Sequence, residues 1–217
     1  MKLIHKDNFK NYIIGLLSLI ISIIAYPKLP DQIPTHFNAQ GVVDAYGSPL
    51  TIFLMPGIML GMCVMAELLK NMDPKKASYS VFSKHYYLFF FVMNMFFFLI
   101  NLYIISYSLE LVTFNVTNIV IVLMGILFIF VGNMMPKIKQ NYFMGIKTPW
   151  TIANDQVWYD THRFGGKVWF AMGIVLCICA FLPSGVMVPV ILASALIGAF
   201  VPMIYSYISF KKVNKEE

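Results

Sequence analysis

The chain has 217 residues, of which 59% are hydrophobic and 12% are charged, with a formal net charge of +6. This composition lies outside the usual range of soluble globular domains and favours a membrane protein. A nucleic-acid-binding protein would need its basic residues gathered on one surface with stacking aromatics, whereas here they follow the apolar segments, so we expect no direct nucleic-acid partner.

The first apolar stretch, at about residues 12–26, follows Lys2, Lys6 and Lys10 and has the outline of a signal peptide. No small-residue cleavage site follows it, and several more apolar segments come later in the chain. We interpret it as a retained transmembrane helix.

Residues 27–50 form the first long polar connection. Pro27, Pro30 and Pro34 fix φ and favour an extended conformation in the preceding residues, so the loop begins stiffly. Thr35–Asn38, the turn Ala39–Gly41 and Val42–Asp44 predict a small hairpin, closed by the turn signal Tyr46-Gly47-Ser48-Pro49.

The candidate ligand-facing residues of this loop are Pro30, Pro34, His36, Phe37, Asn38, Gly41 and Asp44. A metal at His36 would need Asp31 or Asp44 as a partner, and no second ligand stands at a diagnostic spacing. We therefore expect no metal and no cofactor. The alternatives for His36 are a hydrogen-bonded structural role and ligand recognition.

The second and third apolar segments, at about residues 51–69 and 86–107, carry polar side chains. Glu67 lies near one end of its segment with Lys70 three residues on, which favours an interfacial ion pair over a proton relay. On the third segment Tyr87, Asn94, Asn101 and Ser108 recur every seven residues and form one polar stripe. Such a stripe faces other helices, where hydrogen bonds hold the bundle together.

Three further apolar segments follow, at about residues 116–131, 168–182 and 186–208. A helix that crosses the hydrocarbon core needs roughly 20 residues, so we expect the first and fifth segments to extend into their flanks. The three cysteines lie inside apolar segments and indicate neither a disulfide nor a metal pair.

Residues 132–167 form the second long polar connection. A helix is expected from about Asn154, capped by Thr151 or Asn154, and its Trp158, His162, Gly165 and Trp169 share one face. The segment favours either an aromatic and basic anchor at the interface or a hydrogen-bonded pocket. It carries no catalytic signature. The candidate residues are Asn133, Pro136, Asn141, Gly145, Lys147, Thr148, Pro149, Trp150, Trp158, His162, Arg163, Gly165 and Lys167.

The distribution of Lys and Arg predicts the orientation. With six spans and both termini in the cytoplasm, every basic residue except Lys28 falls inside. An odd number of spans moves at least one basic cluster outside. We therefore predict an all-α integral membrane protein whose residues 1–217 form a single six-helix domain, with residues 27–50 outside and 132–167 at the inner face.

Two stretches resemble the family of SdpI-type bacterial immunity proteins. Leu29-Pro-Asp-Gln-Ile-Pro-Thr-His-Phe-Asn-Ala-Gln-Gly-Val-Val-Asp44 is similar to its N-terminal module of unknown function. The run from Gly132 to Thr151, continued by Trp158 and Thr161–Lys167, is similar to its C-terminal signature. Lys147 stands where an Arg is common, which keeps the charge and loses the planar fork.

The resemblance implies a multi-pass protein of the bacterial cell membrane, in contact with membrane lipids, that protects a producing cell against a secreted peptide toxin. In some members it implies signalling to a cytoplasmic transcriptional repressor. Two alternatives are a membrane-embedded enzyme using Glu67, Asp155, His162 and Arg163, and an exporter using the Asn94 and Asn101 stripe. We expect no catalytic residues in the leading hypothesis.

Overall fold

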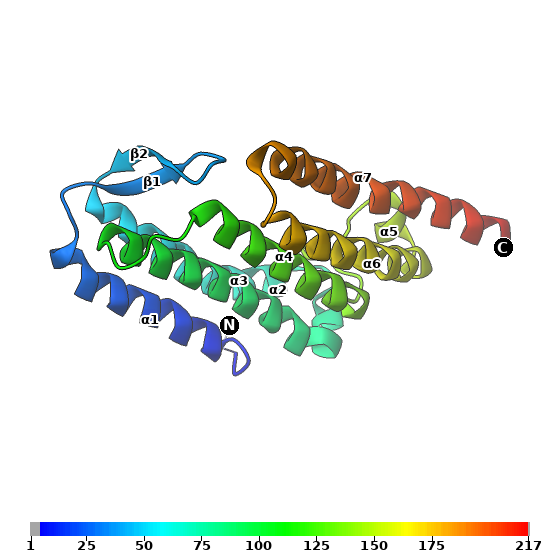
Figure 1. Cartoon of the computed structure of the whole chain (residues 1–217). Helices are drawn as coiled ribbons and strands as arrows, with labels where there is room; N and C mark the ends of the chain where they lie inside the picture. The colour runs from blue at the N-terminus through cyan, green and yellow to red at the C-terminus, as the bar shows by residue number, and fades with distance from the viewer. Residues whose placement is uncertain (1–4, 217) are drawn as a thin grey trace. The chain divides into compact units, whose positions relative to one another are not determined.

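The computed structural model describes residues 5–216, and Lys2, which entered the orientation argument, lies outside that range. Six helices are long and apolar enough to cross a membrane, which confirms an all-α, multi-pass membrane protein (Figure 1). They are α1 (Phe9–Ala25), α2 (Leu54–Met72), α3 (Tyr79–Ser108), α4 (Val116–Met134), α6 (Asp155–Cys179) and α7 (Ser184–Glu216). The cytoplasmic placement of the termini stays a prediction.

Short elements join these helices. The strands β1 (Ile33–Phe37) and β2 (Val43–Gly47) form an antiparallel hairpin, and α5 (Pro149–Ala153) precedes α6. Four short 3-10 helices complete the chain, η1 (Tyr26–Lys28), η2 (Pro49–Phe53), η3 (Lys76–Ser78) and η4 (Met135–Lys137).

The predicted hairpin and helix extensions are confirmed, with shifted boundaries. Helix α1 begins at Phe9 and α6 begins at Asp155, so both short segments gain turns from their polar flanks. Asn154 rather than Thr151 caps α6, because its side chain accepts hydrogen bonds from the Gln156 and Val157 N–H groups. Tyr46 and Gly47 belong to β2 instead of a closing turn, and the chain leaves the strand at Ser48, which caps η2.

The chain divides into two compact units. Unit 1 contains residues up to Glu67 together with Tyr87–Leu123, and unit 2 contains Leu68–Tyr86 together with residues from Met124 onward. The prediction of one transmembrane domain over residues 1–217 stays a prediction.

The apolar core of unit 1 ties the hairpin to the helices. Ile33 of β1, Ala25 of α1, Ile52 of η2 and Ile105 of α3 are buried together. Burying an aliphatic side chain contributes about 1.5–3 kcal/mol, so β1 is part of the unit's core and not a detached loop.

Glycines let α4 and α6 approach closely in unit 2. A Cβ on Gly132 would lie 2.6 Å from the Gly166 carbonyl oxygen, and one on Gly173 would lie 2.5 Å from that of Gly125. On each helix the two glycines are seven residues apart, so they lie on one face. Backbone therefore meets backbone at two levels, as in small-residue interfaces of other membrane helices.

Helix α7 packs alongside α6 in the same unit (Figure 1). Phe164 stacks on Tyr205 with ring centroids 4.1 Å apart, and the Trp169 indole N–H donates to the Gly198 carbonyl at 2.9 Å. The Ser209 hydroxyl of α7 also donates to the Asp160 carboxylate of α6 at 3.3 Å, so an aromatic stack and several hydrogen bonds secure this helix pair.

We predict that Gly173→Ala destabilises the protein by about 1–3 kcal/mol, because the added methyl collides with backbone atoms of α4 that have no freedom to rotate away. The thermal unfolding midpoint of the purified chain in detergent measures the effect. Gly61→Ala in α2 is the matched control, since its Cβ would meet nothing within 4 Å, and it leaves the midpoint unchanged or slightly raised. Equal effects of both substitutions would contradict the close α4–α6 contact.

Candidate functional site

The tip of the outer hairpin is closed by Asn38. Its side-chain oxygen accepts from the Gln40 and Val42 N–H groups, each at 3.0 Å, and its own N–H donates to the Val42 carbonyl at 2.9 Å. Gly41 has φ +78°, a conformation that a residue without Cβ adopts at little cost. Asn38 and Gly41, both expected site residues, therefore shape the turn.

The tip is also fastened to the turn between α3 and α4. Asn115 donates from its side-chain nitrogen to the Gln40 carbonyl at 2.8 Å, and the Thr117 hydroxyl donates to the Asn38 carbonyl at 3.3 Å. A Cβ on Gly41 would collide with the Asn115 side chain. The hairpin is consequently held at both its base and its tip.

The other outer candidates have separate roles. Phe37 packs edge-on against Tyr103 and Tyr107 of α3, and Pro34 is buried opposite Tyr46. His36 bonds through Nδ1 to an Asp44 carboxylate oxygen across the strands, and both side chains are exposed. Pro30 is exposed before β1. Within residues 5–216 no group of three or more His, Cys, Asp or Glu side chains is placed to hold a metal.

Glu67 is buried in unit 1 and receives hydrogen bonds from α3 and from the segment that starts α1. One carboxylate oxygen accepts from the His5 N–H at 3.2 Å and the Asn8 side-chain amide at 3.0 Å, and the other accepts from the Tyr87 hydroxyl at 3.0 Å. Donors to a carboxylate offset the cost of burying its charge. The expected pairing of Glu67 with Lys70 stays a prediction.

Two asparagines of the polar stripe on α3 connect helices of the same unit. Asn94 lies 3.4 Å from the Cys63 sulfur of α2, and Asn101 donates to the Ser18 and Ser22 hydroxyls of α1 at 3.0 and 2.9 Å. Both asparagines are fully buried. These asparagines face neighbouring helices as expected and hold α1, α2 and α3 together, whereas the Ser108 hydroxyl donates to the Ile104 carbonyl of α3 itself at 2.7 Å.

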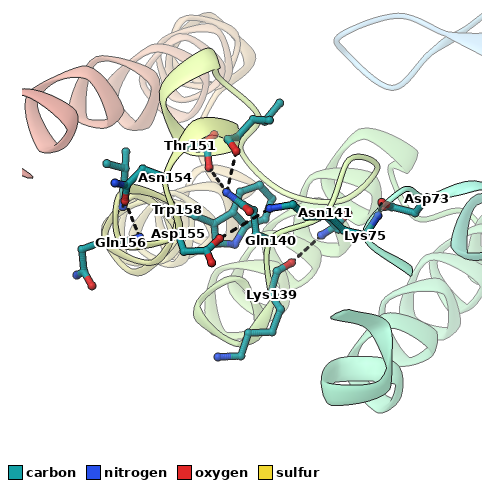
Figure 2. A network of polar contacts seen from close by, with 12 residues as sticks. Asp73, Lys75, Lys139, Gln140, Asn141, Thr151, Asn154, Asp155, Gln156 and Trp158 are labelled. Carbon is teal, nitrogen blue, oxygen red and sulfur yellow. Dashed lines mark hydrogen bonds and ion pairs between the residues drawn. The ribbon is translucent and has the colours of Figure 1, made fainter. Parts of the chain in front are cut away.

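A buried polar network organises the inner loop of unit 2 (Figure 2). Asp73 is 2% exposed and accepts from the Lys75 N–H at 2.7 Å, the Tyr142 N–H at 2.9 Å and the Tyr79 hydroxyl at 2.8 Å. Asn141 accepts from the Phe143 and Met144 N–H groups and donates to the Met144 carbonyl. The network joins the turn after α2 to the inner loop.

Gly145 and His162 meet at the centre of the inner loop. Gly145 has φ +119°, and a Cβ there would strike the His162 imidazole and the Trp158 ring. The imidazole stacks on Trp158 at 4.0 Å, accepts from the Ile146 N–H through Nε2 at 2.9 Å and faces the Trp158 carbonyl through Nδ1 at 2.8 Å. A neutral ring that is protonated on Nδ1 satisfies both bonds.

Thr148 and Thr151 fix the short helix α5. They form a reciprocal capping box, with Pro149 as the first helical residue, and the Thr148 hydroxyl donates to Ser206 of α7 at 3.0 Å. The side-chain nitrogen of Gln140 donates to the Thr151 carbonyl at 2.7 Å (Figure 2). These bonds attach the loop to α7.

Lys147 and Trp150 lie at the edge of the loop. The Lys147 ammonium donates to the Tyr142 and Phe143 carbonyls at 3.2 and 3.1 Å, so it closes a turn. Two hydrogen bonds to carbonyl oxygens need no planar fork, and a lysine therefore suffices at this position. Trp150 packs against Tyr207 of α7 with ring centroids 5.0 Å apart.

The remaining inner candidates separate into a notch and a cleft. At Gly165 the missing side chain leaves a notch in the surface of α6. A Cβ there would meet Ile146 of the loop and Pro202 of α7, so both the loop and helix α7 pack into this notch. Asn133, Pro136, Arg163 and Lys167 instead line one open cleft of about 460 Å³.

The sequence analysis did not identify Asp73, Tyr79 or Gln140. Asp73 is the only acidic residue between Lys70 and Lys84, and it precedes Pro74 at the end of an apolar segment. A lone acid among basic residues at a helix end was the available signal. Tyr79 and Gln140 gave none, because their roles depend on partners 62 and 11 residues away.

We predict that Gly145→Ala unfolds the inner loop locally, because the substitution imposes an unfavourable φ and displaces His162 from the Ile146 N–H. The cost is about 1–3 kcal/mol. Hydrogen exchange of the amides in residues 142–148 measures it, and we expect markedly faster exchange. Gly185→Ala, which has open space around its Cβ, is the control. Unchanged exchange in Gly145→Ala would refute this arrangement.

Two protein-family models match separate parts of the chain, and these parts contain the inner loop and the outer hairpin. The model of the SdpI/YfhL protein family matches residues 137–206, which cover the inner loop, α6 and much of α7. The model of a domain of unknown function (DUF1648) matches residues 13–60, which cover most of α1, the hairpin and the start of α2.

One curated relative matches along nearly its whole length. Immunity protein SdpI of Bacillus subtilis (strain 168) is 28% identical over 212 residues, which are 96% of this chain and 98% of the relative. No solved structure is significantly similar to the chain. With both modules in order and nearly the full length matched, the chain is similar to the SdpI family from end to end, and it is a multi-pass membrane protein.

Proposed function

We propose that this chain is an immunity protein that protects its cell against a secreted peptide toxin. The observation that carries the proposal is the end-to-end similarity to immunity protein SdpI. Protection requires recognition and no bond-breaking step. The recognition surface that we assign is the outer hairpin with the adjoining α3–α4 turn.

The contact between hairpin and turn is flanked by exposed apolar side chains. Val42 follows Gly41 and is 60% exposed, and Phe114 precedes Asn115 and is 67% exposed. Apolar side chains that are fixed and exposed together are typical of a protein-binding surface. Since the backbone beneath them is already ordered, a peptide that binds there orders few additional groups of the receptor.

The charge around this surface is acidic. Residues 27–50 and 109–115 hold Asp31, Asp44 and Glu110 against the single cation Lys28. An apolar peptide with a neutral or positive charge therefore fits better than an acidic one.

The two alternative functions have less support. His162 uses both ring nitrogens on backbone groups, so it is poorly suited to act as an acid or base in an enzyme. The amide nitrogens of Asn94 and Asn101 donate hydrogen bonds to side chains of α2 and α1, which favours a role in helix packing over a path for a solute.

The first test is toxin challenge of cells that carry Val42→Ser together with Phe114→Ser. We expect survival to fall at least about tenfold, because two apolar anchors of the complex are lost. Phe181→Ser is the matched control, since Phe181 is exposed in a different turn and its loss leaves protection intact. Membrane levels of each variant are compared by immunoblot. Full protection by the double variant at a normal level contradicts the assignment of this surface.

We further propose that the inner loop signals to a cytoplasmic transcriptional repressor. Its support is an ordered loop whose surface residues Tyr142 and Lys139 are exposed on the side predicted to face the cytoplasm. An exposed aromatic side chain on an ordered backbone suits a protein partner.

Cells with Tyr142→Ser and Lys139→Gln are expected to survive the toxin and to lose toxin-dependent transcription from the promoter of the gene for this chain. A reporter fused to that promoter measures the response. The double variant Val42→Ser with Phe114→Ser is the converse case, because its cells are expected to lose protection against the toxin. A normal reporter response in the inner variant would exclude this surface as the repressor site.

A further inference from the structure

The open cleft between α4 and α6 in unit 2 is lined by positively charged side chains and by no acidic one. Asn133 of α4 faces Arg163 and Lys167 of α6 across a floor that includes Gly132 and Gly166. Arg163 and Lys167 are one helical turn apart, and both side chains are exposed. The two helices thus present two cations and an amide to one cavity of about 460 Å³.

Neither cation is neutralised by the part of the chain that the structure describes. No carboxylate lines this cleft, and no hydrogen bond or ion pair joins Arg163 or Lys167 to another described residue. The adjacent cleft differs, because there Lys75 lies 3.9 Å from an Asp155 carboxylate oxygen. The first cleft therefore differs from this neighbour in having two cations and no carboxylate among its lining residues.

The cationic face of α6 continues as an apolar one. Phe170, Ile174 and Ile178 follow Lys167 at steps of three, four and four residues, so they extend the same face. They are 37%, 41% and 62% exposed. Lys167 is also the last charged residue before the apolar stretch that begins at Val168, which places the cations at the level of the lipid headgroups.

We propose that this cleft binds one anionic phospholipid. Arg163 and Lys167 bind the phosphate, Asn133 donates to a phosphate or headgroup oxygen, and an acyl chain lies along Phe170, Ile174 and Ile178. A soluble phosphate ester fits the cations equally well but leaves the apolar face unused. The site is independent of toxin recognition and adds a ligand to the proposed immunity function.

The test measures lipid binding to the purified full-length chain in nonionic detergent by native mass spectrometry. The probes are dioleoyl phosphatidylglycerol, zwitterionic dioleoyl phosphatidylcholine and soluble glycerol 3-phosphate. We expect retention of phosphatidylglycerol only. Arg163→Gln with Lys167→Gln weakens that binding about thirtyfold, since each cation near an anionic lipid contributes a several-fold preference.

The control is Lys212→Gln with Lys215→Gln, which removes the same charge from exposed positions on α7 and leaves binding unchanged. Arg163→Lys keeps the charge and retains affinity within about threefold. Equal binding of phosphatidylcholine, equal binding of glycerol 3-phosphate, or the same loss in both double variants overturns the proposal. The unfolding midpoint of each variant is measured alongside, and because the replaced side chains are exposed we expect it to be unchanged.

Discussion

Polar side chains that bind backbone groups hold the non-helical parts of this molecule. An irregular segment has no regular ladder of backbone hydrogen bonds, so it is ordered where side chains satisfy its N–H and carbonyl groups. Asn38 does this for the hairpin tip, Asn141 for the turn after it in the inner loop, and His162 for the Ile146 N–H. Each is a single side chain that binds backbone of its own loop or of one packed against it.

The outer hairpin and the inner loop are both held by such contacts, and each presents a different surface. The hairpin is fastened at its base by Ile33 and at its tip by Asn115, and this leaves Val42 and Phe114 exposed on a stable backbone. The inner loop is fastened to the turn after α2 through Asp73 and to α7 through Thr148. Rigid loops of this kind present surfaces to partners without first paying the entropy of ordering.

The close approach of α4 and α6 has a second consequence besides packing. Because Gly132 and Gly166 bring the backbones together, Asn133 of α4 and the two cations of α6 line one cleft instead of two separate surfaces. Small residues at a helix crossing thereby create a polar cavity at the end of an otherwise apolar helix pair. The proposed lipid site depends on that geometry as much as on the charges.

The amino-acid sequence by itself determined the number of spans, the hairpin and the polar stripe on α3, because hydropathy, periodicity and turn chemistry are local properties. It did not reveal that Asp73 accepts a hydrogen bond from the Tyr142 N–H, that Glu67 accepts one from the Asn8 side chain, or that Asn133 and Arg163 share a cleft. Those relations join residues from 30 to 69 positions apart. Only the tertiary structure decides them, since a buried polar group is satisfied by whichever donor the packing of other helices brings within hydrogen-bond distance.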